Sequence, residues 1–112
     1  MTITPAYILE QETWVALVDE KQVAYYSFKT NGDDLWLDKL WVLPEFMRRR
    51  IGRNLFDHAL ERARIRGFVN LKIEADPNAQ SFYKKMGARK IGEHLGWADG
   101  QLRILSVMEM VL

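Results

Sequence analysis

Three consecutive arginines, Arg48, Arg49 and Arg50, stand where an extended segment gives way to a helix. Apolar residues recur at helical spacing from Ile51, and no Ser, Thr, Asp or Asn stands close before it as a cap. The first N–H groups of a helix lack partners and the helix dipole is positive there, so the arginines oppose the helix. A bound phosphate reverses that effect. The alternative is that the arginines point into solvent or pair with Glu45.

Other kinds of reactive site are absent from the sequence. The chain has no cysteine, which excludes disulfides, thiolate zinc sites and thiol nucleophiles. His94 has no second ligand at metal spacing, and His58 is expected on the helix surface, so we expect no metal. None of the serines considered stands in a nucleophile-elbow context; these are Ser27, Ser81 and Ser106.

The elements that must position the arginines begin with an antiparallel meander. The stretch "TWVALVDEKQVAYYSFKTNGDDLWLDKLWVL" predicts three strands, broken at Asp19-Glu20-Lys21 and at Asn31-Gly32. Trp36 and Trp41 are an odd number of residues apart, so we expect them on opposite faces of the third strand. A helix follows over about residues 48 to 66, with Gly67 as its stop.

The second half predicts a strand, a short helix and two further strands. In "FVNLKIEA", three apolar residues (Leu71, Ile73 and Ala75) face one side, and Asn70, Lys72 and Glu74 face the other. Asp76 is expected to cap a helix that ends at Gly87, and two strands meet at Asp99-Gly100. The sequence therefore predicts an α/β fold of the α+β type. Its single mixed, mostly antiparallel sheet has the order β-β-β-α-β-α-β-β within one domain, residues 1–112.

Composition limits the partners. The chain has 112 residues, is 48% hydrophobic and carries a net charge of +1, as expected of one globular domain without a field that attracts nucleic acid or membranes. No apolar run is long enough to span a membrane, and "MTITPAYILE" lacks the features of a signal peptide. We therefore expect a cytoplasmic protein.

Two segments resemble the GNAT superfamily of N-acetyltransferases. The run "MRRRIGRNLF" is similar to the loop and helix start that hold the pyrophosphate of coenzyme A in this family. Met47 falls on the family's Gln/Arg position, Arg50 on its first glycine and Gly52 on its second, so two of three positions depart. The segment "EADPNAQSFYKKMGARKIGE" is more specific, and it aligns Tyr83 and Asn78 with the family's tyrosine and pantetheine-binding residue.

The resemblance implies an acyl-CoA N-acyltransferase-like fold that transfers acetyl from acetyl-CoA to a primary amine by direct attack. Tyr83 would protonate the leaving thiolate, and Glu74 or Asp38 would act as base or proton relay. Backbone N–H groups around Val42 or Leu43 would stabilise the carbonyl oxygen if that strand bulges and diverges from its neighbour. The expected coenzyme-binding residues are Leu40, Trp41, Val42, Leu43, Arg48, Arg49, Arg50, Ile51, Gly52, Arg53, Asn78, Phe82 and Tyr83.

The N-terminus is shorter than the family pattern. Only "MTITPAYILEQE" precedes Trp14, where relatives usually carry a strand and one or two helices that help to form the acceptor pocket. The sequence therefore leaves the identity of the acceptor open, as either a small molecule or a protein amine. A homodimer is one way to complete the site. Two other functions stay open: a coenzyme A-binding protein that has lost catalysis, and a nucleic-acid-binding module that uses the arginine-rich helix. Acidic Asp57 and Glu61 weigh against the second of these.

Overall fold

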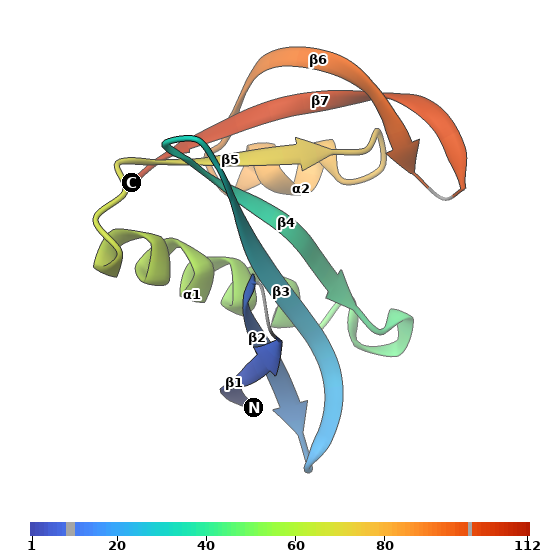
Figure 1. The fold of residues 1–112 in the computed structure, drawn as a ribbon. Helices are drawn as coiled ribbons and strands as arrows, with labels where there is room; N and C mark the ends of the chain where they lie inside the picture. Colours follow the sequence, from blue (N-terminus) through green and yellow to red (C-terminus); the bar gives the residue numbers. More distant parts are fainter. Residues whose placement is uncertain (9–10, 99) are drawn as a thin grey trace.

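The computed structural model describes residues 1–8, 11–98 and 100–112, which form one mixed sheet with two helices (Figure 1). In chain order the elements are β1 (Thr2–Ile8), β2 (Gln11–Val18), β3 (Lys21–Asn31), β4 (Asp34–Val42), the short 3-10 helix η1 (Pro44–Phe46), α1 (Ile51–Ile65), β5 (Asn70–Ala75), α2 (Gln80–Lys85), β6 (Arg89–Ala98) and β7 (Gln101–Val111). The strand order is β1-β2-β3-β4-β5-β7-β6, and only the β4–β5 pair is parallel. This confirms the predicted fold class.

The structure adds a strand ahead of those predicted from the sequence. β1 pairs antiparallel with β2 along its whole length, from Thr2 opposite Leu17 to Ile8 opposite Gln11. Pro5 within this segment has no N–H to donate, which is tolerated because β1 lies at the edge of the sheet. The proline weakens the strand signal in the sequence. The pairing with β2 stabilises the extended conformation that the local sequence does not predict.

The turns follow the predicted breaks. Asp19 and Glu20 both have positive φ, 50° and 66°, and form a two-residue turn between Val18 and Lys21. A two-residue turn with positive φ at both residues has a backbone twist that matches the twist of the paired strands in an antiparallel hairpin. Gly32, with φ of 63°, makes the next turn. Both predicted turns of the meander are confirmed.

Helix α1 begins three residues later than predicted. Arg50 has φ of 61° and ψ of 10°, a left-handed conformation that cannot continue a right-handed helix, so α1 starts at Ile51. Arg48 and Arg49 therefore lie in the turn between η1 and the helix. The C-terminal end of α1 agrees with the prediction that Gly67 stops the helix, because Gly67 has φ of 86° and follows the last turn.

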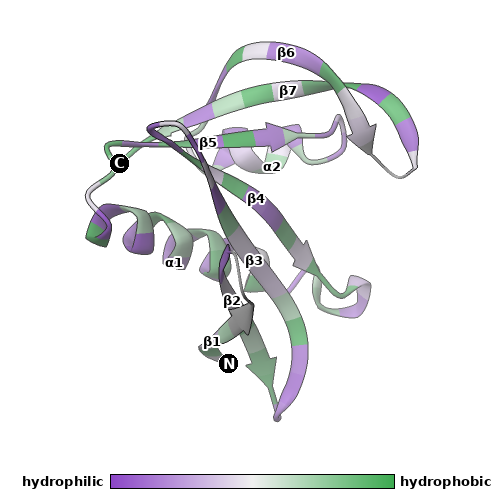
Figure 2. Ribbon diagram, in the orientation of Figure 1, coloured by the Kyte–Doolittle hydropathy of each residue, from purple (hydrophilic) through white to green (hydrophobic). Residues whose placement is uncertain are grey.

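Both helices pack on one face of the sheet. α1 contacts β3, β4 and β5, and its buried residues are apolar. Figure 2 shows hydrophobic and hydrophilic residues alternating along this helix. α2 lies beside it, with the ring centroid of Tyr83 at 5.5 Å from that of Phe56. The predicted apolar face of β5 is buried against them, with Leu71, Ile73 and Ala75 at 1% exposure or less. Neither helix of the described residues has the length and apolar character needed to cross a membrane.

A β-bulge interrupts β4. Ser27 pairs with Lys39 and Phe28 pairs with Leu37, so Asp38 is an extra residue in the ladder. An extra residue changes which face the following side chains occupy. The prediction that Trp36 and Trp41 face opposite sides is therefore wrong, because their β3 partners, Lys29 and Tyr25, are an even number of residues apart.

A polar cluster ties β2 and β3 to α1. The Glu12 carboxylate accepts hydrogen bonds from Arg62 Nε and from Trp14 Nε1, both at 2.7 Å. One strand further, the Tyr26 hydroxyl and His58 Nδ1 are joined by a hydrogen bond of 2.6 Å. His58 is half-buried, with its ring centroid 4.6 Å from that of Trp14, so the expected surface histidine is wrong. The helix presents it to the sheet rather than to solvent.

This environment shifts two pKa values downward. Burial lowers the pKa of His58, and the neighbouring Arg62 charge lowers it further. For Glu12, burial alone would raise the pKa, but the hydrogen bonds from Arg62 and Trp14 outweigh it and the pKa is lowered. Both groups therefore favour the ionisation states found at neutral pH, a neutral imidazole and a charged carboxylate.

The lowered pKa of His58 predicts a loss of stability in mild acid. The unfolded chain takes up a proton at this residue below about pH 6.5, whereas the folded protein resists it, so the contribution is complete above about pH 6.5 and is lost as the pH falls toward the folded-state pKa. We expect the free energy of unfolding, measured by urea titration, to decline less steeply in His58→Gln than in the wild type between about pH 7.5 and about pH 5.5. Asn54→Gln, an exposed position on α1, is the control. Equal slopes in His58→Gln and the wild type would contradict the prediction.

Candidate active site

The sheet opens between β4 and β5. Their parallel pairing consists of two residue pairs, Trp36 opposite Lys72 and Leu37 opposite Ile73, and then the strands diverge (Figure 1). The divergence begins at Asp38, the bulged residue of β4. Beyond this point β4 stays paired with β3 and β5 with β7, but the edges of β4 and β5 that face each other are unpaired, and side chains from the two strands face a shared space.

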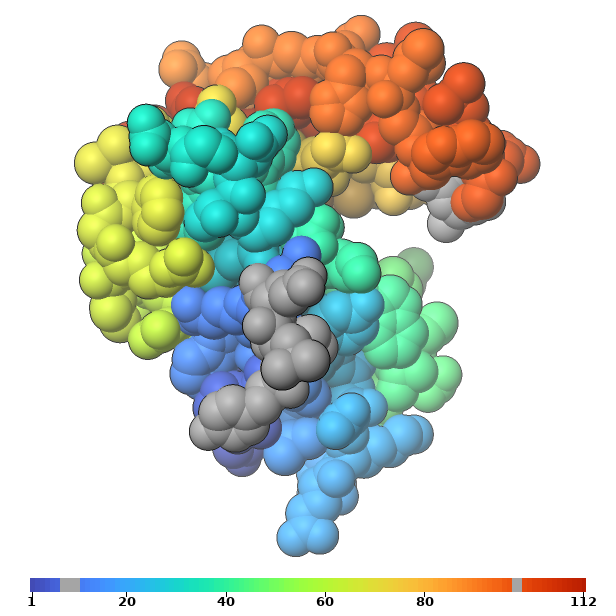
Figure 3. Space-filling view, in the orientation of Figure 1, coloured from blue at the N-terminus to red at the C-terminus, as the bar shows by residue number. Residues whose placement is uncertain are grey.

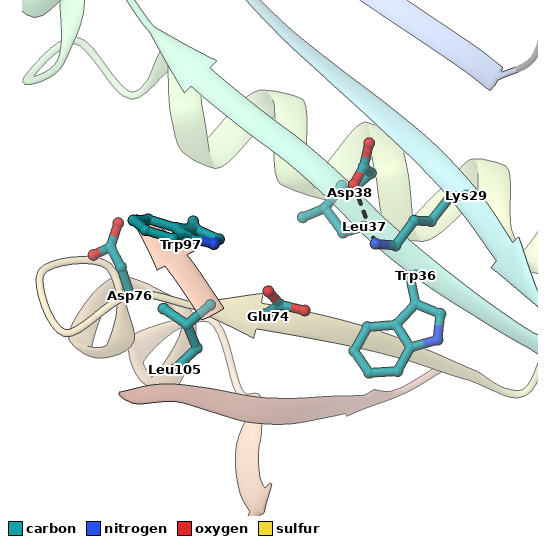
Figure 4. A pocket seen from close by; sticks show the side chains of 8 residues that line it. All are labelled: Lys29, Trp36, Leu37, Asp38, Glu74, Asp76, Trp97 and Leu105. Atoms are coloured by element: carbon teal, nitrogen blue, oxygen red, sulfur yellow. Dashed lines mark ion pairs between the residues drawn. The ribbon is translucent and has the colours of Figure 1, made fainter. Parts of the chain in front are cut away.

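Three adjoining cavities occupy this opening. The first, of about 330 Å³, lies between the end of β4 and the starts of α1 and α2; its lining is Leu40, Val42, Met47, Gly52, Asp76, Asn78, Ala79, Phe82 and Tyr83. The second, of about 290 Å³, is lined by Tyr25, Leu37, Asp38, Lys39, Leu40, Trp41, Glu74, Asp76, Ala79 and Tyr83. The third, of about 240 Å³, is lined by Lys29, Trp36, Leu37, Asp38, Glu74, Asp76, Trp97 and Leu105 (Figure 4).

Because neighbouring cavities share walls, they form one groove. Leu40 and Tyr83 belong to the first and second cavities, and Asp38 and Glu74 to the second and third. The groove thus runs from the start of α1 to the β6–β7 hairpin. Figure 3 shows the molecule hollowed between that hairpin, in orange and red, and the end of β4 with its following turn, in green.

The arginine turn stands at the first end of the groove. Arg50 is the N-cap residue of α1 and its side chain makes no capping hydrogen bond, and the first helical bond is from Asn54 N–H to Arg50 O at 2.9 Å. The N–H groups of the first turn therefore need an external acceptor. A Cβ on Gly52 would lie 3.6 Å from Val42 Cγ2, so the missing side chain keeps the cavity open beside this turn. Uncapped N–H groups, helix dipole and exposed guanidinium groups fit a phosphate.

Tyr83 forms the wall between the first two cavities. Its ring is 93% buried and packs edge-on against Phe56 and Phe82, with centroid distances of 5.5 and 5.2 Å. Burial raises the pKa of Tyr83, and the negative charge of Asp76 raises it further, so the phenol keeps its proton. Asp76 does not cap the short helix as predicted, because α2 begins at Gln80 with Ala79 as its N-cap residue and no side-chain capping bond. Asp76 instead stabilises the preceding turn, since its Oδ1 accepts hydrogen bonds from Asn78 N–H at 2.7 Å and Ala79 N–H at 2.9 Å.

Asp38, Glu74 and Tyr83 line one cavity, although β4, β5 and α2 supply them separately. Asp38 is paired with Lys29 Nζ at 3.4 Å, and a Glu74 oxygen lies 3.1 Å from His94 Nε2. Glu45, considered beside the arginines, is exposed in η1 and contributes to none of the three cavities. The groove therefore combines the Tyr83 phenol with three carboxylates, those of Asp38, Glu74 and Asp76, in different surroundings.

The expected backbone donors differ in availability. The N–H of Leu43 already donates to Val23 O at 2.8 Å, on the β3 side of the strand. Because successive N–H groups of a strand point to opposite edges, the N–H of Val42 points toward the opening beside β5. The preceding bulge and the divergence from β5 are the two conditions that the sequence analysis set for such a donor.

The model of the acetyltransferase (GNAT) domain matches residues 10–87 of this chain. The chain belongs to the GNAT family. It is 30% identical over 86 residues to the peptidyl-lysine N-acetyltransferase YjaB of Salmonella typhimurium, covering 77% of this chain and 56% of that protein. It is 29% identical over 77 residues to the thialysine N-epsilon-acetyltransferase of Bos taurus, covering 65% and 45%. The chain thus spans about half the length of these curated relatives.

A solved structure shows the same fold. The GNAT family acetyltransferase from Elizabethkingia anophelis, with acetyl-CoA bound, matches at a TM-score of 0.84 and 15% identity, covering 99% of this chain and 97% of that chain. GNAT acetyltransferases use acetyl-CoA as co-substrate. Among the described residues no cluster of side chains suited to a metal ion is found.

Some of the residues predicted from the resemblance line the groove and others do not. Trp41 lines the second cavity, whereas none of the three cavities includes Leu43, Arg48, Arg49, Arg50 or Arg53. Six of the predicted coenzyme-binding residues line the first cavity: Leu40, Val42, Gly52, Asn78, Phe82 and Tyr83. Ile51 instead packs into the core, at 5% exposure. The sequence did not predict that Met47, Lys29 and Trp97 line the groove, or that His94 contacts Glu74. The alignment of Met47 with the family's Gln/Arg position was a signal for its place in the site. The positions of the other residues depend on the register of the strands, which the sequence does not give.

Arg50 offers a test of what its side chain adds. Its left-handed backbone is the conformation that glycine adopts readily, and the strain of a side chain there is about 1 kcal/mol. We expect Arg50→Gly to leave the free energy of unfolding unchanged or raised, and to weaken acetyl-CoA binding about three- to tenfold through loss of a charge-assisted contact. Calorimetric titration measures the affinity, and Arg64→Ala, at the far end of α1, is the control. Unchanged affinity in Arg50→Gly would show that the backbone alone holds the anion.

Proposed function

We propose that this chain transfers the acetyl group of acetyl-CoA to a lysine-type primary amine by direct attack within a ternary complex. The observation that carries the proposal is the cavity that Asp38, Glu74 and Tyr83 line together, in the opening of a GNAT sheet and next to an uncapped helix start. A carboxylate, a protonated phenol and free backbone donors are the groups that this transfer needs.

The arginine turn and the first cavity would hold the coenzyme. N–H groups of the first turn of α1 receive the pyrophosphate, and Arg48, Arg49, Arg50 and Arg53 contribute charge. The apolar wall formed by Leu40, Val42 and Phe82 receives the pantetheine arm, with Asn78 as its hydrogen-bonding partner. This arrangement directs the thioester toward the second cavity, which contains Tyr83.

The reaction balances with the residues of the second cavity. Glu74 or Asp38 takes a proton from the acceptor ammonium, and the neutral nitrogen attacks the thioester carbon. The N–H of Val42 stabilises the charge that develops on the carbonyl oxygen. As the new C–N bond forms and the C–S bond breaks, Tyr83 donates its proton to the leaving sulfur. The nitrogen, positively charged after the attack, releases its second proton to solvent, and Tyr83 regains a proton from solvent. Its raised pKa is suited to this role, because the phenol is protonated before the transfer.

A cationic, lysine-type acceptor fits the charge of the groove. Asp38, Glu74 and Asp76 face the third cavity, where Lys29 supplies a balancing charge to Asp38. The names of the two curated relatives refer to peptidyl-lysine and thialysine, both of which present a primary amine on a flexible chain. An ammonium group is attracted into such a carboxylate-lined groove before it is deprotonated.

Tyr83→Phe tests the proposal. We expect the wild type to acetylate lysine-type amines, detected by mass spectrometry of the product and by release of free thiol. Loss of the general acid lowers kcat by about 100-fold in Tyr83→Phe, with the KM for acetyl-CoA nearly unchanged. Ser81→Ala, exposed on the same helix, is the control. Full turnover in Tyr83→Phe would exclude this residue as the acid.

The two alternatives predict different results in the same assay. A coenzyme A-binding protein without catalysis would bind acetyl-CoA and transfer nothing. A nucleic-acid-binding module has less support, because Arg62 and Arg66 pair with Glu12, and Arg64 pairs with Glu61. These pairs engage much of the basic face that nucleic acid would need.

We further propose a homodimer formed through the β6–β7 hairpin. Two cross-strand pairs, Leu95 with Ile104 and Trp97 with Leu102, place four apolar side chains on one face of the hairpin at 59% to 74% exposure. An exposed cluster of this kind is typical of a protein interface. We expect light scattering to give about twice the 13.1 kDa mass of one chain, and the double variant Trp97→Ser, Leu102→Ser to give a monomer. A wild-type mass of one chain at all concentrations would contradict the dimer.

A further inference from the structure

Strand β6 holds the carboxylate of Glu74 from the side opposite β4. His94 Nε2 lies 3.1 Å from Glu74 Oε2. Two residues along the strand, on the same face, a Cβ on Gly96 would lie 3.4 Å from Glu74 Oε1 and 2.4 Å from Leu105 Cδ1. A side chain at position 96 would therefore displace Leu105 and crowd the carboxylate. The hairpin thus places an imidazole nitrogen against one oxygen of Glu74 and leaves a space without a side chain, at Gly96, beside the other.

This contact follows from the register of three strands. β5 pairs with β7, which places Glu74 opposite Val107, and β7 pairs with β6, which places His94 opposite Leu105. The imidazole thus reaches Glu74 across β7. In Figure 4 the Glu74 carboxylate lies between Trp36 and Trp97, in the middle of the third cavity.

We propose that His94 is a positioning residue that relays protons: it accepts through Nε2 the proton that Glu74 takes from the acceptor amine, and releases a proton from Nδ1 to solvent. This inference rests on the proposed acetyl transfer. It concerns the route by which the proton leaves the groove.

The step balances without any further reactant. An N–H bond of the acceptor ammonium breaks and an O–H bond forms on Glu74. The neutral imidazole then takes that proton on Nε2, becomes an imidazolium, and loses the proton on Nδ1 to water, which restores the carboxylate. The ring is left as its Nε2–H tautomer, and proton exchange with water at this exposed position returns it to the starting Nδ1–H tautomer. Imidazole is suited to this exchange because its two nitrogens accept and donate protons near neutral pH.

The surroundings favour Glu74 over Asp38 as the residue that passes the proton on. Asp38 pairs with Lys29 Nζ at 3.4 Å, and an ammonium group has no lone pair with which to accept a proton from it. The partner of Glu74 is an imidazole that can be neutral, and its side chain is 42% exposed, compared with 35% for Glu74. An acceptor seated in the groove covers the inner side of Glu74 and leaves His94 on the outer side.

The other charged groups near this pair have their own partners or roles. Asp76 stabilises the turn before α2, as described above. On the same sheet face, Lys72 pairs with Asp34 at 3.0 Å and Glu109 with Arg89 at 3.6 Å. On β7, Arg103 stands opposite Gly96, and its NH2 donates to Gln101 Oε1 at 3.3 Å. His94 is therefore the side chain beside Glu74 that can carry a proton away from the groove while an acceptor covers the inner side of the carboxylate.

Imidazole rescue tests the relay. Acetyl transfer is compared in the wild type, His94→Ala, His94→Gln and Glu74→Gln, each with increasing imidazole buffer at constant pH and ionic strength. We expect both His94 variants to lose about tenfold in kcat, with the KM for acetyl-CoA unchanged, because each lacks a proton-transfer group. Imidazole should restore much of the rate of His94→Ala, in a saturable manner, and none of that of Glu74→Gln. Glu93→Gln, the preceding residue of β6, is the control and should match the wild type.

The outcomes separate this inference from the function on which it rests. If His94→Gln keeps full activity, or if imidazole leaves the rate of His94→Ala unchanged, His94 only shapes the groove and the relay is overturned. If the wild type transfers acetyl to no amine, the proposed function fails first, and the relay fails with it. If His94 has only a structural role, its variants should have a changed KM for the acceptor, and their rates should not respond to imidazole.

Discussion

The short parallel contact between β4 and β5 is the constraint on which the groove depends. Two residue pairs hold the halves of the sheet together, and the bulge at Asp38 ends the pairing where a longer ladder would have closed the opening. If the pairing were longer, the sheet would cover the space that Tyr83 and Glu74 now face. The helices compensate for the lost hydrogen bonds, because α1 and α2 pack across the same region through Phe56 and Tyr83.

The two ends of α1 have separate tasks. Toward its C-terminus the helix is fixed to β2 by Arg62 and Glu12, and mid-helix to β3 by His58 and Tyr26. Its first turn carries no side-chain cap and is left exposed to an anion. A helix anchored by packing and by a polar cluster can keep an unfavourable N-terminus, since little of its stability comes from the end itself.

The sequence predicted most elements because their signals are local. Turn residues marked the meander, helical spacing marked α1, and Asp76 with a Gly stop marked α2, although Asp76 stabilises the turn before that helix and does not cap it. β1 was missed, since Pro5 weakens a strand that pairing with β2 stabilises. The bulge that turns Trp36 and Trp41 to one face is set by tertiary pairing, and so are the hydrogen bond of His58 to Tyr26 and the contact of His94 with Glu74. No spacing within a single segment encodes these long-range contacts.

The direct hairpin between β1 and β2 affects how an acceptor enters. Ile8 pairs with Gln11, so only two residues join the strands, and no helix fits between them to fold over the groove. If the chain acts as proposed, entry and exit of the acceptor would need no movement of a segment between β1 and β2. Discrimination among acceptors would then depend on the positions of Asp38 and Glu74 in the groove. A lysine on the surface of a large protein would reach these carboxylates past the β1–β2 edge as readily as a free amine.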